Sequence, residues 1–180
     1  LSNFKFDTIL IIILIIMEKT HWLIRVNDGI NFENSIYNFW GVKSGRNDFQ
    51  KTMVKKIAPG DILWFITNKK FGGKAIGMAE YTCFYDRREE PLLQINTYSN
   101  KDQGWIGCDD WDIQIHYINL YLISKQNIKI CVQCAGNILN YDTFAEKKQI
   151  DEDLRNHYQN FKFYSEIKSK NLFKSLFKNK

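Results

Sequence analysis

The sequence predicts an α+β domain built on a small, strongly bent sheet or barrel. Three observations carry this prediction. Short apolar runs typical of buried strands recur along the chain, turn-forming residues join several of them into hairpins, and two short helical patterns follow the first strand. Helices inserted among hairpin-connected strands are typical of this fold class.

The domain begins with a strand and two short helices. The apolar run 21–26 predicts a buried strand, which the turn-forming residues 27–29 close. Apolar residues then recur at three- and four-residue intervals over 32–40, which predicts a helix that ends near Gly41. A similar spacing over 49–57 predicts a second short helix.

A hairpin follows these helices. A Pro-Gly-Asp turn at 59–61 leads into the strongly apolar run 62–67, which predicts a strand. A glycine-containing loop at 68–73 then connects it to a further strand over 74–85. Gly77 in that strand is expected to permit a close backbone approach or a bulge.

The remainder of the domain starts with a long polar loop over 86–110, which is a candidate functional loop because of its length. Residues 111–123 alternate apolar and polar side chains, as a half-buried strand does. Apolar residues over 144–159 have the spacing of one more helix. A short closing strand is expected over 161–164.

Length and composition predict one domain with two appended segments. The 180 residues are 44% hydrophobic and 25% charged, which excludes disorder for all but the ends. We expect the domain to span 17–165. Residues 1–16 form an apolar extension, read either as translation upstream of a natural start at Met17 or as a buried first strand; it is too short for a transmembrane span.

Residues 166–180 form a basic amphipathic tail. Its apolar residues fall at helical spacing between lysines. One interpretation is a C-terminal helix packed on the domain with solvated lysines. The other is an arm that contacts phosphates or an anionic membrane surface.

The four cysteines, Cys83, Cys108, Cys131 and Cys134, are too few and too unevenly spaced for a disulfide framework, which favours a reducing, intracellular compartment such as cytoplasm or nucleus. A formal net charge of +5 permits an anionic partner without establishing one. The sequence leaves the oligomeric state open.

Catalytic motifs are poorly represented. The three histidines stand in separate elements, and the Cys131–Cys134 pair lacks a second pair for zinc. The Asp109-Asp110-Asp112 cluster could hold a divalent metal for nuclease chemistry, although adjacent carboxylates more often solvate a loop. We therefore expect no catalytic residue, no metal and no cofactor.

The aromatic residues are the unusual feature of the composition. The chain holds 5 Trp, 9 Tyr and 13 Phe, more than a core of this size ordinarily requires. Trp22, Trp64 and Trp111 stand in strand patterns and are expected to pack in the sheet. Trp40 and Trp105 are left as candidates for stacking on a nucleobase.

Several segments in a fixed order resemble an EVE domain, a relative of YTH domains in the PUA-like superfamily. They are the Trp-bearing strand 21–27, Trp40-Gly41-Val42-Lys43, the segment 55–65 with its Pro-Gly-Asp turn, the Ile-Gly-x-Ala-Glu strand within 74–81, and the strand 112–123. The resemblance covers about residues 19 to 125.

The resemblance implies a PUA-like bent β-barrel or sheet flanked by short helices, with a cleft for a modified nucleobase. In the YTH branch, aromatic side chains enclose a methylated adenine. Trp40 matches the first tryptophan of that cage, and Trp105 lies in the loop where a second cage residue is expected. Asn27 matches a position that hydrogen-bonds the base edge, and Asn31 matches it more loosely.

The leading hypothesis is a non-enzymatic module that binds DNA or RNA and takes a methylated or flipped base into an aromatic pocket of Trp40, Trp105, Asn27 and Asn31. Lys43 and Arg46 follow Trp40 closely and could contact phosphate, or could be solvated loop charges. The alternatives are a metal-dependent nuclease and a module that docks on a protein or membrane through the chain ends.

Overall fold

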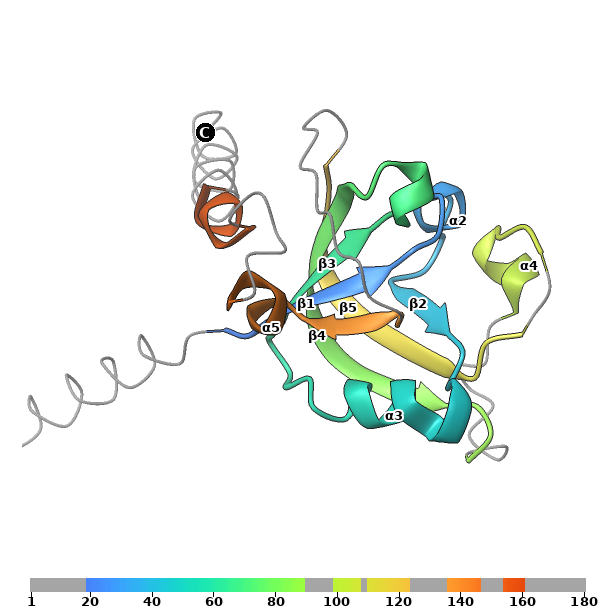
Figure 1. Cartoon of the computed structure of the whole chain (residues 1–180). Coiled ribbons are helices and arrows are strands. Elements are labelled where there is room, and N and C mark those ends of the chain that lie inside the picture. Colours follow the sequence, from blue (N-terminus) through green and yellow to red (C-terminus); the bar gives the residue numbers. More distant parts are fainter. Residues whose placement is uncertain (1–18, 90–98, 108–109, 124–135, 147–153, 161–180) are drawn as a thin grey trace, which may run out of the picture.

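A computed structural model describes residues 19–89, 99–107, 110–123, 136–146 and 154–160. They form an α+β domain in which a six-stranded mixed sheet carries a few short helices (Figure 1). Both predicted tails, the predicted strand 161–164, Asp109 and the Cys131–Cys134 pair lie outside the described residues.

The strands follow the order β2-β5-β4-β3-β1-β6 across the sheet. Their bounds are β1 (His21–Arg25), β2 (Phe39–Val42), β3 (Ile62–Ile66), β4 (Ala75–Asp86), β5 (Ile113–Leu122) and β6 (Ile138–Asn140). β1 and β3 pair in parallel and the other neighbours are antiparallel. The four strands predicted between residues 21 and 123 are confirmed, with small differences at their ends.

The helices are short. Their bounds are α2 (Ile30–Glu33), α3 (Phe49–Val54), α4 (Asn100–Gln103), α5 (Tyr141–Glu146) and the 3-10 turns η1 (Arg46–Asp48) and η2 (Lys69–Phe71); residues 154–160 are also helical. Across the described residues, no helix combines the length and the apolar character needed to cross a bilayer. The single helix predicted over 144–159 begins earlier, at Tyr141, and residues 147–153 lie outside the description.

The helix predicted over 32–40 is wrong beyond Glu33. Phe39 and Trp40 belong instead to β2, where they pair with His116 and Ile115 of β5. The helical spacing was misleading because Ile36, one of the residues that produced it, is 64% exposed and buries no apolar face.

Strands β1 and β3 are buried on both faces, which explains their unbroken apolar runs. Trp22 and Ile24 of β1 join one core cluster, whereas Leu23 joins a second cluster that also contains Trp64 and Leu154. The expected packing of Trp22 and Trp64 in the sheet is therefore confirmed. Residues 154–160 contribute to the second cluster, so the sheet is covered on both sides.

The sheet is not closed into a barrel, so that alternative of the fold prediction is wrong. β2 and β6 are its two edges and do not pair with each other. The sheet nevertheless curls: Nε1 of Trp40 on β2 reaches across to donate a hydrogen bond of 3.2 Å to the carbonyl of Arg25 on β1. Register shifts in β4, at residues 78–80 and 81–83, interrupt the pairing with β5 and allow such bending.

The predicted role of Gly77 is confirmed as a close approach. A Cβ on Gly77 would lie 2.7 Å from Cε1 of Phe32, so a larger residue would displace the side chain that α2 contributes to the core. Phe32 in turn stacks on Phe65 of β3, with ring centroids 4.2 Å apart.

Asp61, the last residue of the Pro-Gly-Asp turn, ties the turn to β1. Its carboxylate accepts hydrogen bonds from the backbone N–H of Thr20 and Ala58 and from Nε1 of Trp22, at 3.2, 2.9 and 3.0 Å. Asp61 and Trp22 are both buried, whereas Thr20 is half-buried and Ala58 is exposed. This is a physical reason for the aspartate in the motif.

We predict that Asp61→Ala lowers the free energy of unfolding by about 2–4 kcal/mol, because it removes three hydrogen bonds and leaves the buried Nε1 of Trp22 without an acceptor. Urea unfolding followed by circular dichroism measures the change. Asp28→Ala is the control: Asp28 is exposed and accepts one backbone N–H, so its loss is expected to cost under about 1 kcal/mol. Equal costs for the two variants would contradict the role given to Asp61.

Candidate functional site

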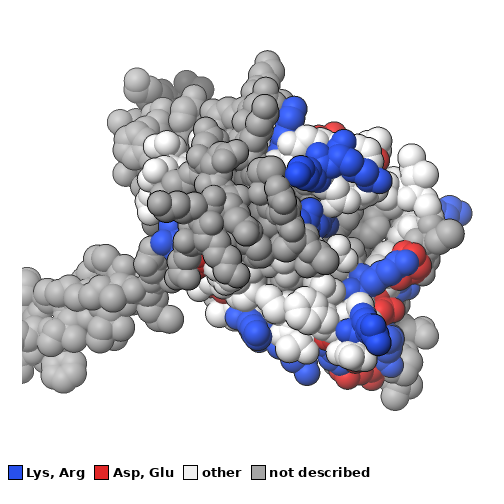
Figure 2. Space-filling model, in the orientation of Figure 1, with Lys and Arg blue, Asp and Glu red and all other residues white. Residues whose placement is uncertain are grey.

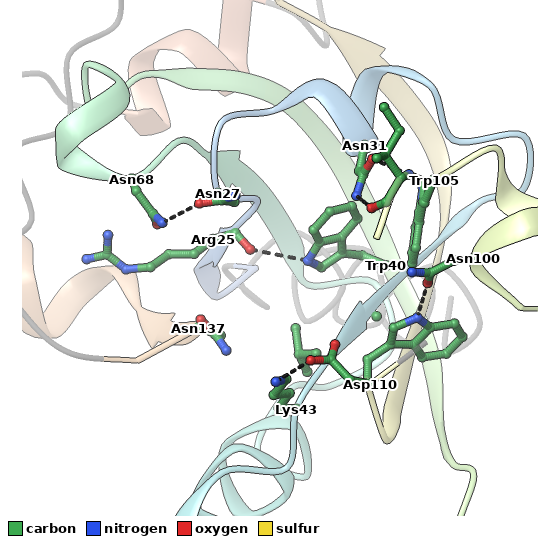
Figure 3. A pocket seen from close by; sticks show the side chains of 14 residues that line it. Arg25, Asn27, Asn31, Trp40, Lys43, Asn68, Asn100, Trp105, Asp110 and Asn137 are labelled. Carbon is green, nitrogen blue, oxygen red and sulfur yellow. Dashed lines mark hydrogen bonds and ion pairs between the residues drawn. The ribbon is translucent and has the colours of Figure 1, made fainter. Parts of the chain in front are cut away.

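A pocket of about 410 Å³ lies where the sheet fails to close, between β2 and the end of β1 (Figure 3). This volume is within the range of small-molecule and base-sized ligand sites. The lining residues are Arg25, Asn27, Asn31, Trp40, Gly41, Val42, Lys43, Asn68, Asn100, Trp105, Ile106, Asp110, Trp111 and Asn137. The pocket therefore brings together all four predicted base-pocket residues, which are distant in sequence.

Three tryptophans form one wall of this pocket. The ring centroids of Trp40 and Trp105 are 4.8 Å apart with their planes inclined at 56°, and those of Trp105 and Trp111 are 5.7 Å apart at 66°. Two rings that hold a base between them need a separation of about 7 Å, because each stacked layer takes about 3.5 Å. Trp40 and Trp105 thus touch as a continuous wall, and no open slot separates them.

Gly41 allows Trp111 to complete the wall. A Cβ on Gly41 would lie 2.4 Å from Cδ2 and 2.6 Å from Cγ of the Trp111 indole, so the ring rests directly on the backbone of β2. Trp111 stands just before β5, and its Nε1 donates to Oδ1 of Asn100 at 2.6 Å. The expected packing of Trp111 is confirmed, because the residue is buried in the same core cluster as Trp22, although it also lines the pocket.

Asn31 and Ser35 hold the segment that carries Trp105. The Asn31 side chain donates to the carbonyl of Ile106 and accepts the N–H of the same residue, both at 2.9 Å. The hydroxyl of Ser35 accepts from Nε1 of Trp105 at 2.8 Å. Both polar ends of the Asn31 amide are thus used to position Ile106, which makes Asn31 a support of the aromatic wall.

Asn27 and Asn68 form a pair on the opposite side of the pocket. Asn27 adopts a left-handed backbone conformation with φ of 56°, and its Oδ1 accepts from Nδ2 of Asn68 at 3.0 Å. Within the described part of the chain, Nδ2 of Asn27 and Oδ1 of Asn68 have no hydrogen-bond partner. The pair therefore presents one donor and one acceptor together at the rim.

Parallel pairing explains why these two asparagines meet. Arg25 at the end of β1 pairs with Ile66 at the end of β3, and an asparagine stands two residues beyond each. The backbone N–H of Asn68 donates to the carbonyl of Asn27 at 2.7 Å, which continues the alignment past the strands.

The two residues predicted to contact phosphate, Lys43 and Arg46, differ in whether they line the pocket. Lys43 lines the pocket and forms an ion pair with Asp110, so its charge is already compensated. Arg46 lies in η1 and is not among the residues that line the pocket. Arg25 is a further pocket cation (Figure 3).

The two described carboxylates of the predicted metal cluster, Asp110 and Asp112, do not converge. Asp110 faces Lys43, whereas Oδ2 of Asp112 accepts from the hydroxyl and the N–H of Ser44 at 2.6 and 3.1 Å. Ser44 in turn accepts from Arg88 at 3.3 Å. Within the described ranges, no group of three or more His, Cys, Asp or Glu side chains is placed to hold a metal ion.

Asp86 is the centre of the network that contains Ser44 and Arg88. Its buried carboxylate accepts from Nε and Nη2 of Arg88 at 2.9 and 2.7 Å and pairs with Lys51 at 2.7 Å. The Arg88 guanidinium holds the pKa of Asp86 well below its usual range, and the Ser44 hydroxyl lowers the pKa of Asp112. These contacts fix the ends of β2 and β4 and the start of β5 beside the pocket.

The residues that the sequence did not predict for this site are mainly polar. The polar ones are Arg25, Asn68, Asn100, Asp110 and Asn137, and the others are Gly41, Val42, Ile106 and Trp111. The sequence offered only a weak signal for Asn68. Asn27 and Asn68 each follow an apolar run, and this becomes informative only when the two runs are known to be parallel neighbours in the sheet.

Comparisons with known proteins give no functional assignment. No family model matches the chain, and no curated protein matches it. Similar solved structures include a hypothetical protein from Leishmania major, with 13% identity over 56% of this chain and 66% of that one and a TM-score of 0.32. A protein from Pseudomonas putida has 12% identity over 71% of this chain and 96% of that one, with a TM-score of 0.37.

We predict that Gly41→Ala displaces the Trp111 indole and lowers the free energy of unfolding by about 1–3 kcal/mol, because the added methyl overlaps the ring. Urea unfolding and near-UV circular dichroism measure both effects. In a Trp111→Ala background the same substitution is expected to cost much less, since the overlap is gone. A cost that is equal in both backgrounds would contradict the contact.

Acid pH is expected to weaken the Asp86 network. Because the folded pKa of Asp86 lies below its unfolded value of about 3.9, the stabilisation is fully present above about pH 5 and is lost as the pH falls through the folded pKa. Asp86→Asn should therefore be less stable than the wild type at about pH 7, with the difference shrinking toward about pH 2. Unfolding free energies across this range test it, with Asp28→Asn as the exposed control; a difference independent of pH would contradict the assignment.

Proposed function

We propose that this protein is a non-enzymatic module that binds DNA or RNA and accommodates a methylated or flipped base in the pocket between β1 and β2. The observation that carries the proposal is the composition of the pocket: a wall of three tryptophans faces a donor–acceptor pair of asparagine amides. A nucleobase combines an apolar face with an edge of donors and acceptors, so the two sides of the pocket match its two kinds of surface.

The polar side would recognise the edge of the base. The Nδ2 donor of Asn27 and the Oδ1 acceptor of Asn68 stand next to each other because the two side chains are hydrogen-bonded. An adjacent donor and acceptor is the arrangement that a base edge complements. In Figure 3 these two residues lie across the pocket from Trp105 and Asn100.

The aromatic side would contact the ring and the methyl group. Each of Trp40 and Trp105 is only 8% exposed, so in this conformation a ligand meets a small part of each ring. A sandwich would require Trp105 to move away from Trp40. The segment that carries it is bounded by Gly104 and Gly107, whose positive φ angles of 75° and 108° suit glycine at a hinge.

We also propose that the fold is PUA-like, of the EVE kind. The order of motifs supports this, and their spatial roles are physically consistent with it. Gly41 of the Trp-Gly-Val segment lies under Trp111, Asp61 of the Pro-Gly-Asp turn binds β1, and Gly77 of the Ile-Gly strand admits Phe32. An unclosed, curled sheet replaces the closed barrel that the family resemblance allows.

We predict that Asn27→Gly weakens binding of an oligonucleotide with a methylated base about tenfold, the equivalent of about 1.4 kcal/mol. Glycine suits the positive φ of Asn27, so the variant removes the amide without straining the backbone. Tryptophan fluorescence titrations with methylated and unmodified oligonucleotides of one sequence measure the affinities.

Asn47→Gly is the matched control. Asn47 also has a left-handed backbone, with φ of 53°, is exposed and does not line the pocket. It should leave the affinity unchanged. Equal affinity for methylated and unmodified oligonucleotides, unaffected by Asn27→Gly, would overturn the proposed function.

A further inference from the structure

We propose that the η2 turn, through Lys69 and Lys70, holds the phosphate backbone of the nucleic acid whose base occupies the pocket. This inference rests on the proposed function and adds an interaction surface to it. It adds Lys69 and Lys70 to the phosphate contacts that the sequence indicated, of which Lys43 is paired with Asp110.

The position of the turn relative to the pocket is the first argument. Asn68 lines the pocket with its side chain, and Lys69 and Lys70 follow it directly in the chain. Both lysines are exposed. Figure 2 shows lysine and arginine side chains gathered over the turn between β3 and β4, where η2 lies in Figure 1.

The second argument is that these charges are uncompensated. Among the described residues, neither Lys69 nor Lys70 forms an ion pair, and the ammonium of Lys70 lies over the ring of Phe71 at 4.7 Å from its centroid. Nearby, Lys43 is neutralised by Asp110. Phosphate neutralisation releases counterions only where a cation is free to replace them, so Lys69 and Lys70 suit a phosphodiester chain better than Lys43 does.

The third argument is that the turn is fixed to the pocket. The N–H of Asn68 donates to Asn27, and the N–H groups of Phe71 and Gly73 donate back to the carbonyl of Asn68 at 2.8 and 3.2 Å. The N–H of Lys74 donates to the hydroxyl of Thr67 at 2.9 Å. The lysine backbones therefore have a defined position beside the Asn27–Asn68 pair.

The place of η2 at the rim also suits a strand that enters the pocket. The aromatic wall lies on one side of the pocket, and Asn27 and Asn68 lie on the other (Figure 3). A nucleic acid whose base enters the pocket crosses this rim, part of which is formed by Asn68, the residue directly before η2. Phosphate contacts from η2 position the strand, whereas the amide pair reads the base.

The test is the salt dependence of binding by the full chain carrying Lys69→Gln and Lys70→Gln together. Single-stranded oligonucleotides with one methylated base, as DNA and as RNA of the same sequence, are titrated between about 50 and 200 mM salt. Losing two phosphate contacts should reduce the slope of log affinity against log salt by about 1.4 and weaken binding, while the preference for the methylated base stays unchanged.

Lys55→Gln with Lys56→Gln is the matched control. These two neighbouring lysines are also exposed, carry the same charge change and do not line the pocket. Their replacement should leave the slope within error of the wild type. Thermal unfolding of both double variants checks that neither fold is altered.

Two results would overturn the inference: an unchanged slope in the η2 variant, or an equal loss of slope in both double variants. Failure of the proposed function has a different signature, in which the η2 variant lowers the slope but neither the methyl group nor Asn27→Gly affects affinity. Absence of binding to every oligonucleotide at low salt would overturn both. Comparison of the DNA and RNA arms identifies which sugar the surface accepts.

Discussion

One hydrogen bond across an unclosed sheet underlies the arrangement of the candidate site. β2 and β1 are separated by three strands in the sheet order, yet Nε1 of Trp40 reaches the carbonyl of Arg25. The sheet must therefore curl until its β2 edge faces the end of β1, while pairing between its two edges is never made. The gap that remains is the pocket. The Trp40 side chain spans this gap. Backbone pairing between the strands would have closed the gap, and the absence of any contact would have left an open groove.

The polar groups around this gap divide into those that build it and those that remain available. Asn31, Ser35 and Asn100 are engaged with Ile106, Trp105 and Trp111, so they support the aromatic wall. The pair of Asn27 and Asn68 uses one oxygen and one nitrogen internally and retains the other two. A polar group that is already hydrogen-bonded within the protein gains little free energy from a ligand. A polar group that is hydrogen-bonded to water can exchange that water for the edge of a base. Residue type alone therefore does not identify a contact residue.

The sequence predicted what depends on local pattern and missed what depends on long-range pairing. The runs that became β1 and β3 were recognisable because both faces of those strands are buried. The apolar spacing from Phe32 to Trp40 is typical of a helix. Only the pairing of Trp40 with Ile115 shows that its end belongs to a strand. Trp111 was assigned to the sheet because alternation continues into β5, but its place is set by Gly41, seventy positions earlier in the chain. Asn68 gained its role from the parallel alignment of two strands that no local pattern reveals.

The contact between Trp40 and Trp105 determines what a planar ligand must do to be enclosed. Moving Trp105 away would break its bond to Ser35 and the two bonds between Asn31 and Ile106. At about 1 kcal/mol each, these three bonds represent about 3 kcal/mol, or roughly a hundredfold in the population of an open state. A ligand that only touches the edge of the wall avoids this cost but forgoes stacking, which contributes about 1–3 kcal/mol per base. Separating Trp105 from Phe39, Trp40 and Trp111 adds a packing cost, so the proposed enclosure of a base would need a further apolar group, such as a methyl, to add its burial to the stack.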